Sequence, residues 1–379
     1  IALAVQGMDT EINFDFSGML DGLDEPCPCV AEVAALIGDK EQLLAERNIL
    51  HGEKAMLESQ ILDWRAKQWE LPLPIPTVEA DIPPFATPDS NGFHLEDIGA
   101  GVWGIWRNNY RAVLYVTTTG AILVDAPPST FFEAMSPPMD ITGIISQITP
   151  NEVTHVLYSH THNDHIGAAA AVLAAFPGAI VVGTQAQVDE LTMRADPTRP
   201  VPTLIIGGNE DFIHEDQTLE VFTLDSGHGN AGILGVLHPV SDSVFVADLI
   251  NPGSVPFFRF TLTQDIEKYM LAHAELGAMS FTTLIPAHNR IANKSAVLLQ
   301  EQYVGDVVEA MAGALYTLDW GAVITPIVDA TGDFGLWTRG FWQLGRYVEE
   351  ANQQCVATIQ AAWKDLLADT AVFTKSHCD

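Results

Sequence analysis

The feature that most constrains this chain is the six-residue segment 160–165, which reads HTHNDH. It places three imidazoles and one carboxylate within about one turn of backbone. His160 and His162 stand two residues apart, so their side chains share one side of an extended segment, and the next turn brings Asp164 and His165 toward a second ion. A lone histidine is usually an ordinary surface or core residue. Three histidines with an aspartate at this spacing instead predict a metal site.

The flanking residues place this segment at the end of a buried strand. Residues 153–159 are mostly β-branched and apolar, which predicts a strand that runs directly into His160. On the other side, residues 166–175 are rich in alanine and predict a helix, which Pro177 and Gly178 close. Ligand sites of α/β sheets lie at the carboxyl ends of strands. The predicted metal site is therefore in the expected place.

Further candidate ligands also follow predicted strands. His228 lies between two glycines after the strand-like residues 219–224, and those glycines let the backbone pass close to an ion. Asp248 follows the apolar residues 244–247, and His288 follows residues 284–287. Asp125 ends a fourth strand-like segment, 121–124. Structural histidines have no reason to occupy strand ends repeatedly, so we expect these residues to converge on one site.

This series of motifs resembles the metallo-β-lactamase-fold hydrolases over roughly residues 99–288. The resemblance implies an α/β fold, an αββα sandwich that holds two metal ions between its sheets, with helical segments added at the N- and C-terminal sides. It also implies an early aspartate, Asp125 here, that supports the ligands. Carried over residue by residue, it assigns the first ion to His160, His162 and His228, the second to Asp164, His165 and His288, and a bridging role to Asp248.

The ligand set also departs from one branch of the family. The commonest β-lactamases of this fold place a cysteine on the second ion and lack the bridging aspartate. Asp248 resembles instead the arrangement of glyoxalase II, the lactonases and the phosphodiesterases. The resemblance therefore implies a hydrolase of a small ester, lactone or thioester. The alternatives are β-lactam hydrolysis and a mononuclear iron oxygenase of the persulfide dioxygenase type, which metal analysis and oxygen uptake would separate from a hydrolase.

The ligand types indicate the chemistry. Imidazoles and carboxylates suit Zn²⁺, and they also accept Mn²⁺, Fe²⁺ or Ni²⁺, so two zinc ions are the expectation. Two ions that share a water would lower its pKa from about 15.7 toward about 7, which yields a metal-bound hydroxide as the nucleophile. Asp164 would lie beside that water and is the candidate catalytic residue that relays its proton to the leaving group.

Charge and hydropathy limit the classes of partner. The 379 residues carry 49 acidic and 17 basic side chains, a formal charge of −32. Such a surface repels nucleic-acid phosphates and anionic membranes, which leaves a small-molecule substrate and no nucleic acid as the expectation. The sequence contains no uninterrupted apolar stretch of about 18 residues or more, so we expect no membrane span.

The four cysteines are Cys27, Cys29, Cys355 and Cys378, and none belongs to the ligand series. Cys355 and Cys378 flank the last predicted helix and would close a disulfide in an oxidising compartment. Together with the first residues, which resemble the end of a secretory signal, they favour a secreted or periplasmic protein, although a cytoplasmic one with four free thiols is the alternative.

The chain divides into three predicted regions. Residues 1–90 comprise an amphipathic helical segment over 30–69 and a proline-rich connector, and the helix offers a surface for a homodimer. Residues 91–292 form the metallo-β-lactamase-like core. Residues 293–379 are predicted to be helices that pack on this core. A silent scaffold driven by the N-terminal helix is a further alternative, but scaffolding would not require seven metal-binding side chains.

Substrate contacts are the least constrained prediction. Phe257, Phe258 and Arg259 follow Asp248 closely enough to reach substrate, and Trp337 lies in an aromatic, glycine-rich segment. Each could equally be a surface or core residue. Since no lysine or arginine cluster adjoins the ligand motifs, we expect a neutral substrate with a hydrophobic portion.

Overall fold

The structure is a computed structural model that describes residues 93–107, 110–128, 141–229, 232–331 and 337–379. The chain separates into two compact units, Ile1–Leu73 and Pro74–Asp379, and only the second contains described residues. The predicted N-terminal helix, the proline-rich connector, the homodimer surface, and Cys27 and Cys29 lie outside them. Those interpretations stay predictions.

The first sheet has seven strands in chain order. Its strands are β1 (His94–Gly99), β2 (Val102–Arg107), β3 (Tyr110–Val116), β4 (Gly120–Val124), β5 (Glu152–Leu157), β6 (Ile180–Gly183) and β7 (Leu204–Ile205). The strands β1 to β4 pair antiparallel, and β4 to β7 pair parallel. The strand predicted over 153–159 is thus β5, which begins one residue earlier and ends two residues earlier.

The second sheet has five strands in the order β12-β11-β10-β9-β8. They are β8 (Glu210–His214), β9 (Gln217–Leu224), β10 (Ile233–His238), β11 (Ser243–Val246) and β12 (Thr283–Pro286). The strands β8 to β11 pair antiparallel, and β11 pairs parallel with β12. The predicted strands at 219–224, 244–247 and 284–287 correspond to β9, β11 and β12.

Side-chain alternation shows that the two sheets pack face to face. In β4, Ile122 and Val124 belong to the apolar cluster shared with β9 to β12, whereas Ala121 and Leu123 belong to a second cluster on the opposite face. Successive residues of a strand point to opposite faces, so β4 is buried from both sides. Ile144, a helix residue, also belongs to the second cluster. A helix therefore covers that outer face of the first sheet.

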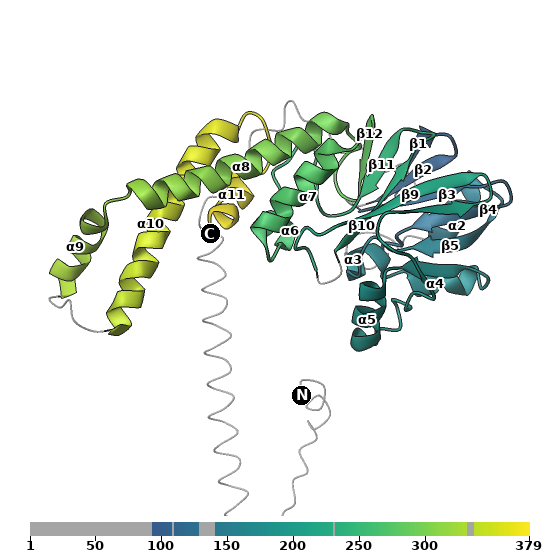
Figure 1. Ribbon diagram of the computed structural model, residues 1–379, viewed down its shortest axis with the longest axis horizontal. Coiled ribbons are helices and arrows are strands. Elements are labelled where there is room, and N and C mark those ends of the chain that lie inside the picture. Colours follow the sequence, from purple (N-terminus) through teal and green to yellow (C-terminus); the bar gives the residue numbers. More distant parts are fainter. Residues whose placement is uncertain (1–92, 108–109, 129–140, 230–231, 332–336) are drawn as a thin grey trace, which may run out of the picture. The chain divides into compact units, whose positions relative to one another are not determined.

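Helices cover the outer face of each sheet (Figure 1). Beside the first sheet lie α2 (Ile141–Ile148), α3 (Asn163–Ile166), α4 (Ala169–Ala175) and α5 (Gln185–Arg194); beside the second lie α6 (Phe258–Leu262), α7 (Ile266–Ala278) and the start of α8 (Lys294–Thr317). The layers are therefore helix, sheet, sheet, helix, which confirms the predicted αββα sandwich. The alanine-rich run predicted as one helix is divided into α3 and α4 at Gly167 and Ala168.

The C-terminal region is helical, as predicted. After α8 come α9 (Trp320–Thr331), α10 (Trp337–Trp363) and α11 (Thr370–Cys378). Val297, Tyr303, Ile359 and Trp363 are buried in the same apolar cluster as the second sheet, so this region packs on the core. None of the described helices alone is long and apolar enough to cross a membrane; α8 and the start of α9 meet that criterion only as a bent pair.

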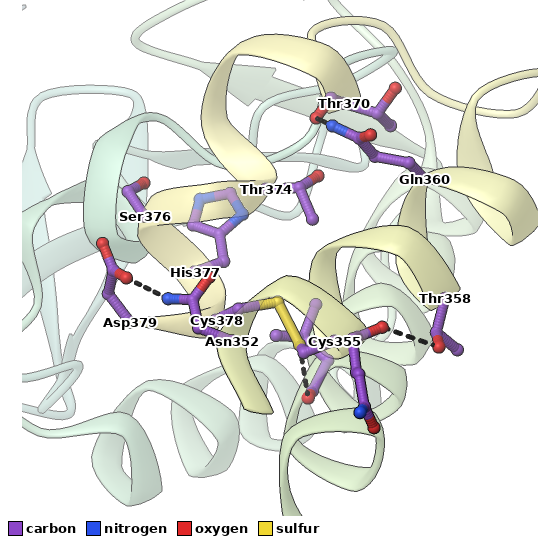
Figure 2. The surroundings of a disulfide bond; sticks show 12 residues. Asn352, Cys355, Thr358, Gln360, Thr370, Thr374, Ser376, His377, Cys378 and Asp379 are labelled. Atoms are coloured by element: carbon purple, nitrogen blue, oxygen red, sulfur yellow. Dashed lines mark hydrogen bonds between the residues drawn. A yellow bond between two sulfur atoms is a disulfide. The ribbon is translucent and has the colours of Figure 1, made fainter. Parts of the chain in front are cut away.

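A disulfide joins Cys355 of α10 to Cys378 at the end of α11, across a sequence separation of 23 residues (Figure 2). This confirms the predicted pairing. Both cysteines are buried. The last residues are further held by a hydrogen bond from the Asn352 side chain to the Asp379 carboxylate and by one from Gln360 Nε2 to the Thr370 carbonyl, 3.2 Å long. The disulfide therefore fixes α11 against α10.

The disulfide predicts a measurable thiol count. Protein denatured without reductant should show two free thiols at most, because Cys355 and Cys378 are already bonded. Reduction should lower the free energy of unfolding by about 3 kcal/mol, since a loop of roughly this length is no longer closed in the unfolded chain. Thiol titration and urea unfolding with and without reductant check both values. Four free thiols in the unreduced protein would contradict the bond.

Two histidines of the helical layer predict a pH dependence of stability. Burial lowers the pKa of His273 to about 4 and that of His377 to about 4. The unfolded chain then binds more protons than the folded one between the ordinary histidine pKa and these values. Stability is present near pH 7 and is lost as pH falls from about 6.5 toward about 4, by up to about 3 kcal/mol for each histidine.

Urea unfolding of chelator-treated protein at pH 7.0 and pH 5.5 measures this loss, in a window where most carboxylates stay ionised. The variant His273→Gln keeps an amide that can hydrogen-bond Tyr269 and Gln300 but cannot titrate, so it should lose less stability than the unsubstituted protein over the same interval. Equal losses in the two proteins would contradict the assignment to His273.

Candidate metal centre

The predicted ligands follow strand ends that share one edge of the sandwich. His160 and His162 lie in the loop after β5, and Asp164 and His165 lie in the short helix α3 that follows directly. The loop after β9 carries the next candidate, His228. Because all these strands end at the same edge, residues far apart in the sequence meet there.

The side chains form two neighbouring groups whose ligand atoms all lie within 4.8 Å of one another in each group. The first group consists of His160, His162, His228 and Asp248, and the second of Asp164, His165 and His288. The structure thus brings together all seven residues that the sequence motifs single out. It divides them between two positions, as the family resemblance implies.

Asp248 stands between the two groups. Its Oδ2 lies 3.0 Å from His228 Nε2 and 3.3 Å from His160 Nε2. Its Oδ1 lies 2.8 Å from His288 Nε2 and 3.1 Å from His165 Nε2. One carboxylate oxygen therefore faces each group. This is the geometry expected of a carboxylate that bridges two cations.

Asp125 makes contacts that support two of the candidate ligands. The Asp125 carboxylate is fully buried and accepts hydrogen bonds from Ser159 N–H, at 2.8 Å, and from Ser159 Oγ, at 2.7 Å. Its Oδ2 also lies 3.4 Å from His165 Nδ1, and Ser159 Oγ lies 3.0 Å from His160 Nδ1. Asp125 thus reaches one histidine of each group, His165 through an ion-pair contact and His160 through the Ser159 hydroxyl. Contacts of this kind influence ring orientation and ligand basicity.

The loop that carries His228 depends on glycine. Gly227 has a φ of +68°, and a Cβ atom placed on it would lie 2.6 Å from Thr263 Oγ1. Only glycine tolerates both this backbone and this close approach. His228 Nδ1 lies 2.5 Å from the carbonyl oxygen of Thr261, which directs the opposite nitrogen, Nε2, toward Asp248.

The carbonyl that holds His228 belongs to a left-handed turn. This turn lies within α6. It consists of Arg259, Phe260, Thr261 and Leu262, whose φ values are +50°, +50°, +58° and +61°. Left-handed backbone costs about 1–2 kcal/mol for each residue other than glycine. Such a run persists only where surrounding contacts hold it, and strain of this kind is concentrated at functional sites. Because the turn contains no glycine, sequence patterns gave no signal of it.

Burial and charge set the protonation of the cluster. Burial, followed by the neighbouring His160 and His228, lowers the pKa of His162 to about 3. Burial also acts to lower the pKa of His165, but the Asp248 and Asp125 carboxylates outweigh it and raise that pKa well above its ordinary value. Burial acts to raise the pKa of Asp248, but His165 and His288 hold it well below its usual range. The site thus combines an ionised Asp248 carboxylate with a neutral His162 imidazole at pH 7.

The residues fit two divalent cations. His160 Nε2 and Asp248 Oδ1 are buried and make no hydrogen bond of normal geometry among the described residues, and their close neighbours, Asp248 Oδ2 and His288 Nε2, are themselves candidate ligand atoms. Buried polar atoms normally have a partner, and atoms left without one call for an explanation such as an unseen ion. Neutral imidazoles and carboxylates are the ligands that zinc and related transition metals bind. The donor set and the buried atoms without a hydrogen bond therefore both fit bound metal ions.

A cavity of about 560 Å³ opens beside the two groups. Its lining includes Tyr110, whose ring lies 5.1 Å from that of His288, together with Phe257, Asp369 and Phe373. Asp369 and Phe373 belong to the C-terminal segment. The sequence did not suggest them as cavity residues, because more than 80 residues separate them from His288. A cavity this size suits a small molecule.

The predicted substrate contacts are only partly gathered here. Phe257 lines the cavity, whereas Phe258 and Arg259 are absent from its lining. The Arg259 guanidinium instead lies 5.3 Å from the Phe258 ring centre, and Arg259 lines a separate cavity beside α8. Trp337 begins α10, but its side chain lies outside the described part of the chain.

Several solved structures are similar to this chain. Among solved structures, the chain is similar to a metallo-beta-lactamase from Pontibacter korlensis, with 19% identity and a TM-score of 0.45 over 55% of this chain and 99% of that one. It is also similar to the metallo-beta-lactamase IND-7, with 18% identity and a TM-score of 0.45 over 55% of this chain and 98% of that one. No curated protein matches the chain.

The sequence of residues 106–291 matches the family model described as the metallo-beta-lactamase superfamily. That interval contains Asp125 and all seven candidate ligands. The chain therefore carries a metallo-beta-lactamase superfamily domain over residues 106–291.

Proposed function

We propose that this protein is a dinuclear, zinc-dependent hydrolase of small neutral esters, lactones or thioesters. The observation that carries the proposal is the position of Asp248, with one carboxylate oxygen facing each of two histidine-containing groups. Scaffold or binding proteins have no use for such an arrangement. Hydrolysis by activated water does, because two cations on either side of one water can activate it as the nucleophile and stabilise the leaving group.

Each of the two metal ions would have its own set of ligands. His160, His162 and His228 would hold one ion, Asp164, His165 and His288 the other, and Asp248 would contact both. When bound, the ions would lower the pKa of a water molecule and polarise the bond to be cleaved. Asp125, through Ser159 and His165, keeps the imidazoles in the orientation that such binding needs.

Asp164 has a second role in this proposal. It is only partly buried, it lines the cavity, and its Oδ2 lies 3.5 Å from His165 Nε2. A carboxylate in this position can accept a proton and deliver it to the departing alcohol or thiol. The other carboxylate of the centre, Asp248, is 6% exposed and less able to exchange protons with substrate.

The cavity supports a neutral substrate. Its walls include the apolar side chains of Val255, Phe257, Leu262 and Phe373, and its lining among the described residues contains no lysine or arginine. Recognition of a phosphate or carboxylate would normally need such a cation. The formal charge of −32 further disfavours anionic substrates as they approach. An ester or lactone with a hydrophobic portion therefore fits the cavity better than a phosphodiester.

A secreted or periplasmic location is part of the proposal. It is supported by the Cys355–Cys378 disulfide, since such bonds persist mainly in oxidising compartments.

The test of function compares kcat/KM for an aryl ester, a medium-chain lactone, a thioester, a bis-aryl phosphodiester and a β-lactam under one zinc loading. We expect the ester or the lactone to exceed the phosphodiester and the β-lactam by at least about 10-fold, which corresponds to about 1.4 kcal/mol of transition-state binding. The variant His162→Ala, purified identically, controls for a contaminating esterase and should lose the activity. A preference for the phosphodiester or the β-lactam would overturn the substrate assignment.

A further inference from the structure

The C-terminal helix α11 packs against the left-handed turn that faces the metal centre. Ser376 Oγ accepts a hydrogen bond from the backbone N–H of Arg259, at 3.0 Å. His377 Nε2 lies 3.3 Å from the carbonyl oxygen of Phe257. The His377 ring also stacks on Phe260, with 4.4 Å between ring centres and 20° between planes. Ser376 and His377, which are adjacent in α11, therefore contact Phe257, just before the turn, and Arg259 and Phe260 within it.

The hydrogen bonds of His377 fix its tautomer. Its Nδ1 lies 2.8 Å from the Tyr303 hydroxyl, and that hydroxyl lies 3.1 Å from Thr374 Oγ1. When Thr374 donates to Tyr303 and Tyr303 donates to Nδ1, Nε2 carries the proton and donates to the Phe257 carbonyl. Burial, which lowers the His377 pKa, keeps the ring neutral at pH 7, as this arrangement requires.

The left-handed turn also holds the loop that carries His228. The Thr261 carbonyl accepts from His228 Nδ1, with 2.5 Å between the two atoms. Two further bonds hold the residues just before His228: Thr263 Oγ1 donates to the Ser226 carbonyl, at 2.7 Å, and Gln264 N–H donates to the Gly227 carbonyl, at 3.0 Å. The direction of the His228 ring thus depends on the turn.

α11 itself is anchored independently of the turn. At its start, Ala368 N–H donates to the Gly253 carbonyl and Val255 N–H donates to the Ala368 carbonyl, both at 3.0 Å. At its end, the disulfide joins Cys378 to Cys355, and Figure 2 shows Ser376 and His377 on the same final turns of the helix. A helix fixed at both ends can hold a strained backbone in place.

We propose that Ser376 and His377 are positioning residues for the metal ligand His228. They hold the turn of residues 259–262 in its left-handed form, and the turn aims the His228 imidazole at the first metal position. This inference rests on the proposed role of His228 as a ligand. The sequence placed no functional residue in α11, so the helix acquires a role beyond covering the core.

The experiment compares three variants. His377→Leu removes both ring nitrogens at similar volume, and His377→Gln retains an amide that can donate to the Phe257 carbonyl. His238→Leu is the matched control, since His238 is likewise buried and hydrogen-bonded, to Gln217 and Ser241, and no contact joins it to the turn or to α11 among the described residues. The first readout is the zinc dissociation constant of each site, measured by competition with a chromogenic chelator.

We expect one of the two zinc ions to bind about 10- to 100-fold more weakly in His377→Leu, the range typical for loss of a residue that orients a ligand. The Gln variant should largely restore the affinity. His238→Leu should melt at a lower temperature and yet bind zinc as the unsubstituted protein does. A purely structural role for His377 would instead lower the melting temperature and leave both dissociation constants unchanged.

The second readout needs no metal. Hydrogen exchange of chelator-treated protein should be faster in the peptide covering residues 257–264 of His377→Leu than in the same peptide of His238→Leu. Unchanged zinc affinity in His377→Leu, or unchanged exchange in this peptide, overturns the positioning role. Failure of the unsubstituted protein to bind zinc would contradict the proposed function, and with it the ligand role of His228, and so is distinguishable from failure of the positioning role alone.

Discussion

The rest of the site depends on one buried carboxylate held between two sets of imidazoles. Removing the Asp248 carboxylate from water is costly unless positive charge surrounds it, and in the absence of metal His165 and His288 supply that charge. The fold meets this demand by ending β11 at the same edge as β5, β9 and β12. The segments that follow β5, β9 and β12 then bring histidines to the two carboxylate oxygens.

This convergence requires unusual backbone at several points. Asp125 and Asp248 both have positive φ, of +61° and +50°, although neither is glycine. Asp125 directly follows β4, and Asp248 lies two residues after β11. The left-handed turn at residues 259–262 carries the carbonyl that contacts His228. Strain is therefore concentrated around the metal centre, where buried hydrogen bonds and packed helices can hold it.

The sequence predicted the parts of the site that obey local rules. Strand patterns located β4, β5, β9, β11 and β12, and residue types that bind metal stand directly after them, so the fold and the converging residues followed from short stretches of chain. The left-handed turn could not be predicted, since no glycine marks it. The cavity wall formed by Phe373 and Asp369 depends on how α10 and α11 return to the core. Long-range packing of this kind leaves no local pattern.

The left-handed turn also determines where the predicted substrate contacts lie. Proximity to Asp248 in sequence suggested Phe257, Phe258 and Arg259 as a set. The turn that begins there rotates successive side chains, so Phe257 reaches the metal cavity while Arg259 lines another. In our proposal, the lack of a lysine or arginine on the described lining of the cavity beside the metal centre makes it selective by shape and apolar contact. The disulfide-anchored helix α11 supplies part of that shape and, in our proposal, also positions His228.

The most direct test of a two-metal centre bridged by Asp248 is the zinc content of the unsubstituted protein and of Asp248→Asn after equilibration with the same zinc concentration. Asparagine keeps the shape but loses the charge that holds two cations. We expect about two zinc ions per chain in the unsubstituted protein and about one or fewer in the variant, with its circular dichroism spectrum unchanged. Two zinc ions retained in a fully active Asp248→Asn protein would contradict the bridging role.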